Sequence, residues 1–298
     1  MLKLNMGSLE EEKRVAESEE KRPESLTCPN KRAIKIHIRN HYTHLYEGRQ
    51  ICRVPIRTGR SLAEALGYPL DLLDFVPEDH WARFVPCGNP LRMVHPAQGE
   101  RILNLGCGAA VDSFALWALY GASVRIVSTD IVFSVLRNNS ELARISAGPF
   151  HPEIHSSARP KDVLSWVCAD GEQLPFQPGA FHWVIMNGVF NLFPDKASLL
   201  AEVMRILRPG GRLAGTDLCI DAPLPDYFHE ERDAWAWCMS GACMDEELIG
   251  LLRNSRFEEI RLDHEEDGDM FHRVAFCCRK STAEPTNEVA ADVIIRNS

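Results

Sequence analysis

The sequence has no long apolar run. Its uninterrupted hydrophobic stretches, such as Val184-Ile185-Met186, are far shorter than the ~20 residues that a membrane-spanning helix needs. The residues from Met1 to Ser25 are charged and polar, without the apolar centre of a secretory signal. We therefore expect no membrane partner and a cytoplasmic location.

Positive charge is also scarce. The 298 residues include 33 Lys and Arg against 42 Asp and Glu, which gives a formal net charge of −9. A nucleic-acid binder generally needs a basic face, so this balance argues against a nucleic-acid partner. The hydrophobic fraction of 45% still supplies enough apolar material for a sizeable core. The sequence does not indicate an oligomeric state.

Closely spaced metal-ligand pairs are missing as well. None of the ten cysteines belongs to a CxxC motif, the spacing typical of zinc sites. His37, His41 and His44 are loosely spaced, and we expect no metal site among them. In a reducing cytosol most of the cysteines should be free thiols.

Strands and helices alternate in the middle of the chain, over residues 99–218. This alternation is typical of βαβ units around a parallel sheet. We expect strands at Arg101–Leu105, Ser123–Ser128, Val163–Cys168, Trp183–Met186 and Arg212–Asp217, followed by a late antiparallel pair at Glu258–Asp263 and Arg273–Arg279. The prediction is therefore an α/β fold with a doubly wound, mainly parallel, seven-stranded sheet.

The segments that flank this core have different compositions. Residues 1–30 are charge-dense and predict a disordered tail. Residues 31–98 predict an N-terminal helical extension or cap, in which Ser61 begins a helix as an N-cap. Residues 219–280 should complete the same domain, and residues 281–298 are polar and predict a flexible tail.

A glycine turn follows the first predicted strand, where Leu103–Ala110 reads LNLGCGAA. Glycines at such a turn let the backbone approach a ligand closely, and the following helix offers free N–H groups. A dinucleotide fingerprint, GxGxxG, would need glycine at position 111, which is Val111. A methyltransferase loop, GxGxG, would need glycine at position 110, where Ala110 adds only one methyl group. The second interpretation fits better.

Acidic residues follow the next two strands. Asp130 ends the second strand, where a carboxylate can accept both ribose hydroxyls, although an Asp there can also cap a helix. Asp170-Gly171 follows the third strand, and Asn187 ends the fourth. With the turn LRPGGRL at Leu207–Leu213, these motifs resemble class I S-adenosylmethionine-dependent methyltransferases over roughly residues 98–218.

That resemblance implies a Rossmann-like fold with S-adenosyl-L-methionine as the cofactor. It assigns cofactor contacts to Asn104, Gly106, Cys107, Gly108, Asp130, Ile131, Asp170, Gly171 and Asn187. One position departs from the pattern, because the family usually carries Asp or Glu where Asn104 stands. Asparagine can donate a hydrogen bond but holds no charge near the cationic sulfonium.

Three further motifs are similar to those of arsenite methyltransferases. Arg83–Pro90 (RFVPCGNP) resembles the element that carries the family's first arsenic-binding cysteine, which places Cys87 at that position. Met186–Lys196 (MNGVFNLFPDK) matches the motif after the fourth strand, except that Gly188 replaces the cysteine. The family's Cys-x-x-Gly-Ala element corresponds to CMSGA, which begins at Cys238. The resemblance implies that Cys87 and Cys238 are the catalytic thiolates and that residues 219–280 lie on the substrate side.

Three functions are open at this point. The first is methyl transfer to a small molecule with a trivalent arsenic centre, which is thiophilic and is completed by three thiolates, or by two when arsenic already carries an organic group. Cys107, Cys219 and Cys243 are possible stand-ins for the missing third thiol.

The second function is methyl transfer to a non-arsenical organic small molecule, for which Gly188 would open room. An oxygen or nitrogen acceptor would then need a general base, with His182 and Glu172 as candidates. The third function is that of a non-catalytic protein on the same fold. The departures from the methyltransferase pattern at Asn104 and Ala110 favour this interpretation.

Overall fold

The computed structural model describes residues 30–48, 58–146, 158–225, 227–228, 231–266, 270–282 and 293–297. The tail expected over residues 1–30 lies outside these ranges, apart from Asn30. Within them, no helix combines the length and the apolar character that crossing a membrane requires.

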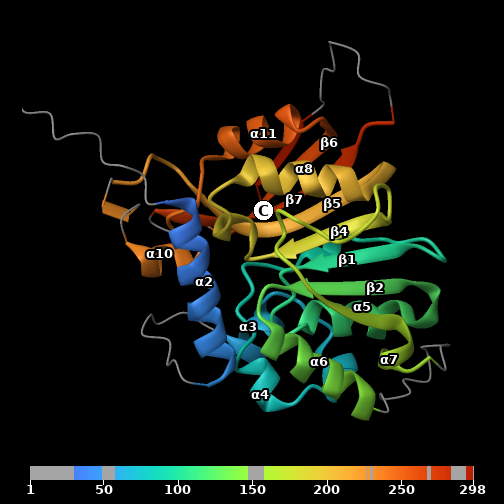
Figure 1. The fold of residues 1–298 in the computed structure, drawn as a ribbon. Coiled ribbons are helices and arrows are strands. Elements are labelled where there is room, and N and C mark those ends of the chain that lie inside the picture. The colour runs from blue at the N-terminus through green and yellow to red at the C-terminus, as the bar shows by residue number, and fades with distance from the viewer. Residues whose placement is uncertain are drawn as a thin grey trace, which may run out of the picture.

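A single eight-stranded sheet runs through the molecule in the order β3-β2-β1-β4-β5-β7-β6-β8 (Figure 1). The strands are β1 (Arg101–Leu105), β2 (Arg125–Asp130), β3 (Leu164–Cys168), β4 (Phe181–Asn187), β5 (Leu207–Ile220), β6 (Phe257–Glu266), β7 (Phe271–Lys280) and β8 (Val293–Asn297). The first five strands are parallel to one another, whereas β7 is antiparallel to both β5 and β6. The predicted doubly wound, mainly parallel α/β fold is confirmed.

Helices cover both faces of this sheet (Figure 1). The helices of the described residues are α2 (Lys31–Tyr46), α3 (Gly59–Ala65), α4 (Glu78–Trp81), α5 (Val111–Tyr120), α6 (Phe133–Ile145), α7 (Pro160–Val163), α8 (Lys196–Ile206), α10 (Arg232–Ala236) and α11 (Asp245–Asn254). Successive strand residues point to opposite faces. Ile102 of β1 accordingly belongs to the core with α5 and α6, while Leu103 and Leu105 belong to the core with α8 and α11.

The predicted N-cap at Ser61 is wrong. The helix α3 begins at Gly59 after the N-cap residue Thr58, so Ser61 lies inside it. The Gly59 amide donates to the Phe84 carbonyl at 2.9 Å, and a Cβ at this positive-φ position would lie 3.1 Å from the Trp81 carbonyl oxygen. Tertiary packing against the α4 region therefore starts the helix earlier than the local capping signal indicates.

The expected flexible tail over residues 281–298 contains the eighth strand. β8 pairs in parallel with β6, with Val293 opposite Ile260. Its neighbours Ile294 and Ile295 are exposed, so the strand buries little apolar surface and has no amphipathic pattern to reveal it.

The helix α2 lies across the carboxyl ends of the central strands and not along the sheet (Figure 1). Ile34 and Ile38 of α2 pack with Trp235 of α10 in a small core of their own. The Tyr42 hydroxyl donates to the Ala236 carbonyl at 2.9 Å. These contacts place α2 directly over the edge where the parallel strands end.

Candidate functional site

A cavity lies at the carboxyl ends of β1, β2 and β4, with α2 forming part of its wall. The atom-free space in it and at its open mouth is about 990 Å³. Eight of the nine predicted cofactor contacts line it: Gly106, Cys107, Gly108, Asp130, Ile131, Asp170, Gly171 and Asn187. The strand order thus brings together residues from the ends of four strands, β1 to β4.

The glycine turn forms the floor of this cavity. Gly106 has φ +71° and Gly108 has φ +47°, conformations that favour glycine. A Cβ on Gly106 would collide with the Val189 side chain, and one on Gly108 would lie 2.5 Å from the Tyr46 hydroxyl oxygen. Ala110, the N-cap of α5, also has a positive φ of 59°, which agrees with the GxGxG interpretation of this loop.

Asp130 joins the glycine turn to the end of β2. Its carboxylate accepts hydrogen bonds from the Gly108 and Val132 amides, each at 2.9 Å. Burial raises the pKa of Asp130, while these amide hydrogen bonds lower it. Because a carboxylate has about four acceptor positions, Asp130 can hold the turn and still accept a ligand's hydroxyl groups.

Asn104, the ninth predicted contact, lies outside the cavity lining. It is buried beneath the turn, where its side-chain amide donates to the Ser113 hydroxyl at 2.8 Å. The Ser113 hydroxyl is in turn 2.8 Å from that of Ser128. In this structure Asn104 supports the strand ends from below.

Asp112, which the sequence analysis missed, lines the cavity instead. The carboxylate is 3% exposed and accepts hydrogen bonds from the Tyr68 hydroxyl at 2.5 Å and the Asn187 amide at 3.2 Å. Burial raises the pKa of Asp112 to about 6, although both hydrogen bonds lower it. An acid in the first turn of α5, directly after the glycine turn, was the available signal. With this pKa its carboxyl group is mainly ionised at neutral pH, which puts a negative charge beside the glycine turn.

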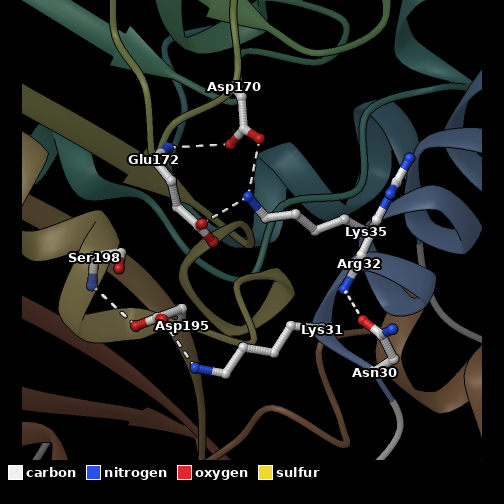
Figure 2. A network of polar contacts seen from close by, with 8 residues as sticks. All are labelled: Asn30, Lys31, Arg32, Lys35, Asp170, Glu172, Asp195 and Ser198. Carbon is white, nitrogen blue, oxygen red and sulfur yellow. Dashed lines mark hydrogen bonds and ion pairs between the residues drawn. The ribbon is translucent and has the colours of Figure 1, made fainter.

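Ion pairs hold α2 over the cavity (Figure 2). The Lys35 ammonium lies 2.9 Å from the Asp170 carboxylate and 2.7 Å from that of Glu172. Nearer the start of α2, Lys31 pairs with Asp195 at 2.8 Å. Burial alone lowers the pKa of Lys35, but its two acidic partners raise it above the ordinary value. Glu172, a general-base candidate from the sequence, is therefore an ion-pair partner of the helix.

The two predicted catalytic cysteines converge beside the cavity. Ligating atoms of Cys87, Cys238 and Asp217 all lie within 4.8 Å of one another. The Cys238 thiol donates to the Gly188 carbonyl at 3.2 Å, and a Cβ on Gly188 would lie 3.1 Å from the Cys87 sulfur. Since Gly188 itself lines the cavity, the thiols stand directly behind one point of its wall.

Asn187 fixes the turn that carries Cys87. Its side-chain oxygen accepts from the Cys87 amide at 3.0 Å and the Gly88 amide at 3.3 Å, and its nitrogen donates to the Gly88 carbonyl at 3.1 Å. The Thr216 hydroxyl donates to the same side-chain oxygen at 2.8 Å. Asn187 therefore links the Cys87 turn to β4 and β5, whatever it contributes to a bound cofactor.

The remaining candidates lie elsewhere. His182 is at the amino end of β4, where its Nδ1 accepts from the Arg101 amide at 3.2 Å, and Asn187 is at the opposite end. Cys107 lines the cavity, and burial raises its pKa well above the ordinary value. Cys219 and Cys243 are partners in an isolated β-bridge near the end of β5. Neither of these two lines the cavity.

Comparison with known proteins gives consistent matches. Residues 96–275 match a family model described as a methyltransferase domain. An arsenite methyltransferase of Halobacterium salinarum is 28% identical over 220 residues, covering 72% of this chain and 51% of that protein. The O-methyltransferase cnsE of Penicillium expansum is 35% identical over 133 residues, covering 44% of this chain and 42% of that protein.

A solved structure gives the same picture of the fold. It is that of CrArsM, an arsenic(III) S-adenosylmethionine methyltransferase from Chlamydomonas reinhardtii, with 25% identity and a TM-score of 0.58. The match covers 71% of this chain and 73% of that one. The chain spans about half the length of the curated relatives it matches.

Proposed function

Because this chain belongs to the methyltransferase-domain family, we propose that it transfers a methyl group from S-adenosyl-L-methionine to a small trivalent arsenical held by Cys87 and Cys238. The observation that carries this proposal is the convergence of the two thiols and Asp217 behind Gly188, in the wall of the glycine-turn cavity. The matches to arsenite methyltransferases support the choice of substrate.

The cavity residues fit the cofactor. The positive-φ glycines form a floor of bare backbone, and the Val189 and Tyr46 side chains pack where a Cβ would lie. Asp130 can accept hydrogen bonds from ribose hydroxyls. Asp170 pairs with Lys35 through one carboxylate oxygen and can accept a hydrogen bond from an adenine amino group through its remaining acceptor positions. The Asp112 carboxylate would balance the positive charge on the sulfonium, at the end of the cofactor away from the adenine. Bound there, S-adenosylmethionine would supply an electrophilic methyl group on a cationic sulfur.

The thiols are suited to a substrate with two exchangeable hydroxyls. A hydrogen bond with Cys87 and burial together raise the pKa of Cys238, so this thiol is protonated at neutral pH. Each thiol can then condense with one As–OH group of methylarsenite, forming an As–S bond and releasing water. Two thiols thus occupy both hydroxyl positions of a monosubstituted arsenical.

The held arsenic needs no general base. Trivalent arsenic keeps a lone pair, which would attack the methyl carbon as the carbon–sulfur bond of the donor breaks. The electron pair of that bond would stay on the donor sulfur, and the positive charge would pass to a four-coordinate arsenic that both thiolates hold. The protein's contribution is to hold the two centres in line and to exclude water. The position of the thiols behind Gly188, in the wall of the cavity, favours that alignment.

The test is methylation of methylarsenite by wild type, Cys87→Ser and Cys238→Ser, with Cys277→Ser on β7 as the control. We expect a loss of at least ~100-fold in rate for each of the first two variants, because serine cannot form the As–S bond. The control should match wild type, and S-adenosylhomocysteine should bind all four proteins alike by calorimetry. Wild-type rates in both Cys87→Ser and Cys238→Ser would refute the thiolate role.

A second candidate is methyl transfer to a non-arsenical organic molecule, which the match to an O-methyltransferase and the small Gly188 favour. Tight binding of S-adenosylhomocysteine without affinity for methylarsenite would select it. Absence of binding for both ligands would select a non-catalytic protein.

A further inference from the structure

A second group of sulfur, nitrogen and oxygen ligands lies outside the cavity. The Cys219 sulfur, a carboxylate oxygen of Asp245 and a ring nitrogen of His272 all lie within 4.8 Å of one another. Cys219 is near the end of β5, Asp245 begins α11, and His272 is near the start of β7. Cys219 is 1% exposed and His272 is 6% exposed, so these groups are removed from water.

The groups around these three residues hold them in place. One oxygen of Asp245 lies 3.0 Å from Nε2 of His272, and the other lies 2.6 Å from Nε2 of His264. The second ring nitrogen of His272, Nδ1, lies 3.2 Å from the Asp221 carboxylate. A carboxylate on the outer nitrogen of a ligating histidine is a common feature of zinc sites, where it fixes the ring and its tautomer.

The donor set selects the kind of ion. Thiolate, imidazole and carboxylate together are ligands of Zn²⁺, whereas Mg²⁺ and Ca²⁺ take oxygen ligands. Three protein ligands would occupy three positions of a tetrahedral site, and Cys243, the β-bridge partner of Cys219, is a further thiol on the neighbouring segment.

Two other groups of ligating residues are less suitable. His37, His41 and Asp233 include an aspartate whose side chain is 77% exposed. Cys87, Cys238 and Asp217 contain no imidazole and belong to the acceptor position described above.

We propose that Cys219, Asp245 and His272 form a zinc site, with Cys243 as the nearest candidate for a fourth ligand. The segment between Cys238 and Asp245 already pairs with the end of β5, since the Ile220 amide donates to the Cys243 carbonyl at 3.2 Å. An ion bound to both Cys219 and Asp245 would cross-link that segment to the sheet. The site would thus stabilise the loop that carries Cys238 without touching the acceptor.

The experiment uses the full chain, freed of metal by a chelator and titrated with ZnCl₂. We expect one zinc per chain in wild type and in the Cys87→Ser/Cys238→Ser double variant. Cys219→Ser and His272→Asn should each weaken zinc affinity by about 100-fold or more, and Asp221→Asn by about tenfold because it acts through His272. The side chain of Asp221 is 69% exposed, so Asp221→Asn should fold normally. This variant therefore still tests the site if the substitution of a buried ligand prevents folding.

Cobalt(II) gives a readout that is independent of methyl transfer. Wild type and the double variant should both show a thiolate-to-cobalt charge-transfer band, and Cys219→Ser should lose most of it. Cys277→Ser and His37→Asn are matched controls and should bind zinc as wild type does. Wild type that binds no zinc would overturn the proposal. So would zinc that is lost in the double variant but retained in Cys219→Ser and His272→Asn, because the ion would then occupy the acceptor thiols.

Discussion

The proposed site has two halves that meet at Gly188. The cofactor half is the cavity at the glycine turn with Asp130 and Asp170, and the thiol half is the group formed by Cys87, Cys238 and Asp217. The two halves are assembled in different ways. In the cofactor half, Asp130 ends β2 and Asp170 comes shortly after β3, so the strand order alone places them at one edge of the sheet. In the thiol half, Cys87 and Asp217 are 130 residues apart in the sequence, and a hydrogen-bonded asparagine holds the turn that brings Cys87 to the wall. The first half therefore depends on backbone conformation and the second on side-chain contacts between distant segments.

The largest effect should come from the backbone of the cofactor half. Gly106→Ala places a methyl group against Val189 at φ +71°, and we expect affinity for S-adenosylhomocysteine to fall by at least ~100-fold, measured by calorimetry. Gly99→Ala is the matched control, because Gly99 has φ +84° but a Cβ added there would meet nothing within 4 Å. If both variants bound the ligand as wild type does, the turn would not be the cofactor floor.

Removing the charge of Asp112 should have the next largest effect. We expect Asp112→Asn to weaken S-adenosylmethionine binding about tenfold at pH 7, because a buried carboxylate no longer faces the cation. Burial raises the pKa of Asp112 to about 6, so wild-type affinity should increase as pH rises through 6 and the carboxyl ionises. In the variant that increase should disappear, and calorimetry between pH 5 and 7 measures it. An unchanged pH profile would remove Asp112 from the site.

Asn187 tests where the boundary between the halves lies. In Asn187→Ala the Cys87 turn loses its anchor, so we expect methyl transfer to methylarsenite to fall about tenfold. Affinity for S-adenosylhomocysteine should change less than about threefold, because Asp112 loses the Asn187 amide but keeps its hydrogen bond from the Tyr68 hydroxyl. Equal losses in rate and in cofactor affinity would assign Asn187 to the cofactor half, as the sequence predicts.

The smallest effect should come from Lys35. Its side chain is 25% exposed, and ion pairs near the surface contribute about 0–1 kcal/mol. We therefore expect Lys35→Met to change cofactor affinity by no more than about threefold, measured by calorimetry. Lys31→Met, which removes the pair with Asp195, is the control for a general loosening of α2. A tenfold loss confined to Lys35→Met would show that its cation is part of the cofactor site.

The same contrast explains what could be predicted from the sequence. The parallel core and the cofactor half follow from short-range rules, because apolar strands, the glycine turn and acids at strand ends are local patterns. The sequence does not single out Asp112 as a site residue, because an acid in the first turn of a helix is usually explained by the helix dipole. Long-range contacts could not be predicted for a different reason. No local pattern indicates that Gly59 packs against Trp81 or that β8 pairs with β6.

The thiol half could be anticipated only through the resemblance to arsenite methyltransferases. Nothing local to Cys87 or Cys238 indicates that their sulfurs approach each other, because the chain between them forms most of the sheet. Asn187 shows the limit of that approach. The resemblance assigns it to the cofactor, yet three of its hydrogen bonds hold the Cys87 turn.

The 16-residue helix α2 contacts both halves, through Lys35 to Asp170 and through Tyr42 to the carbonyl of Ala236, near Cys238. A ligand that shifts the position of this helix in one half must change the affinity of the other half, and linkage requires the two changes to be equal. Donor and acceptor should therefore bind cooperatively. The degree of that cooperativity would be set by the free energy of moving one helix and not by direct contact between the two ligands.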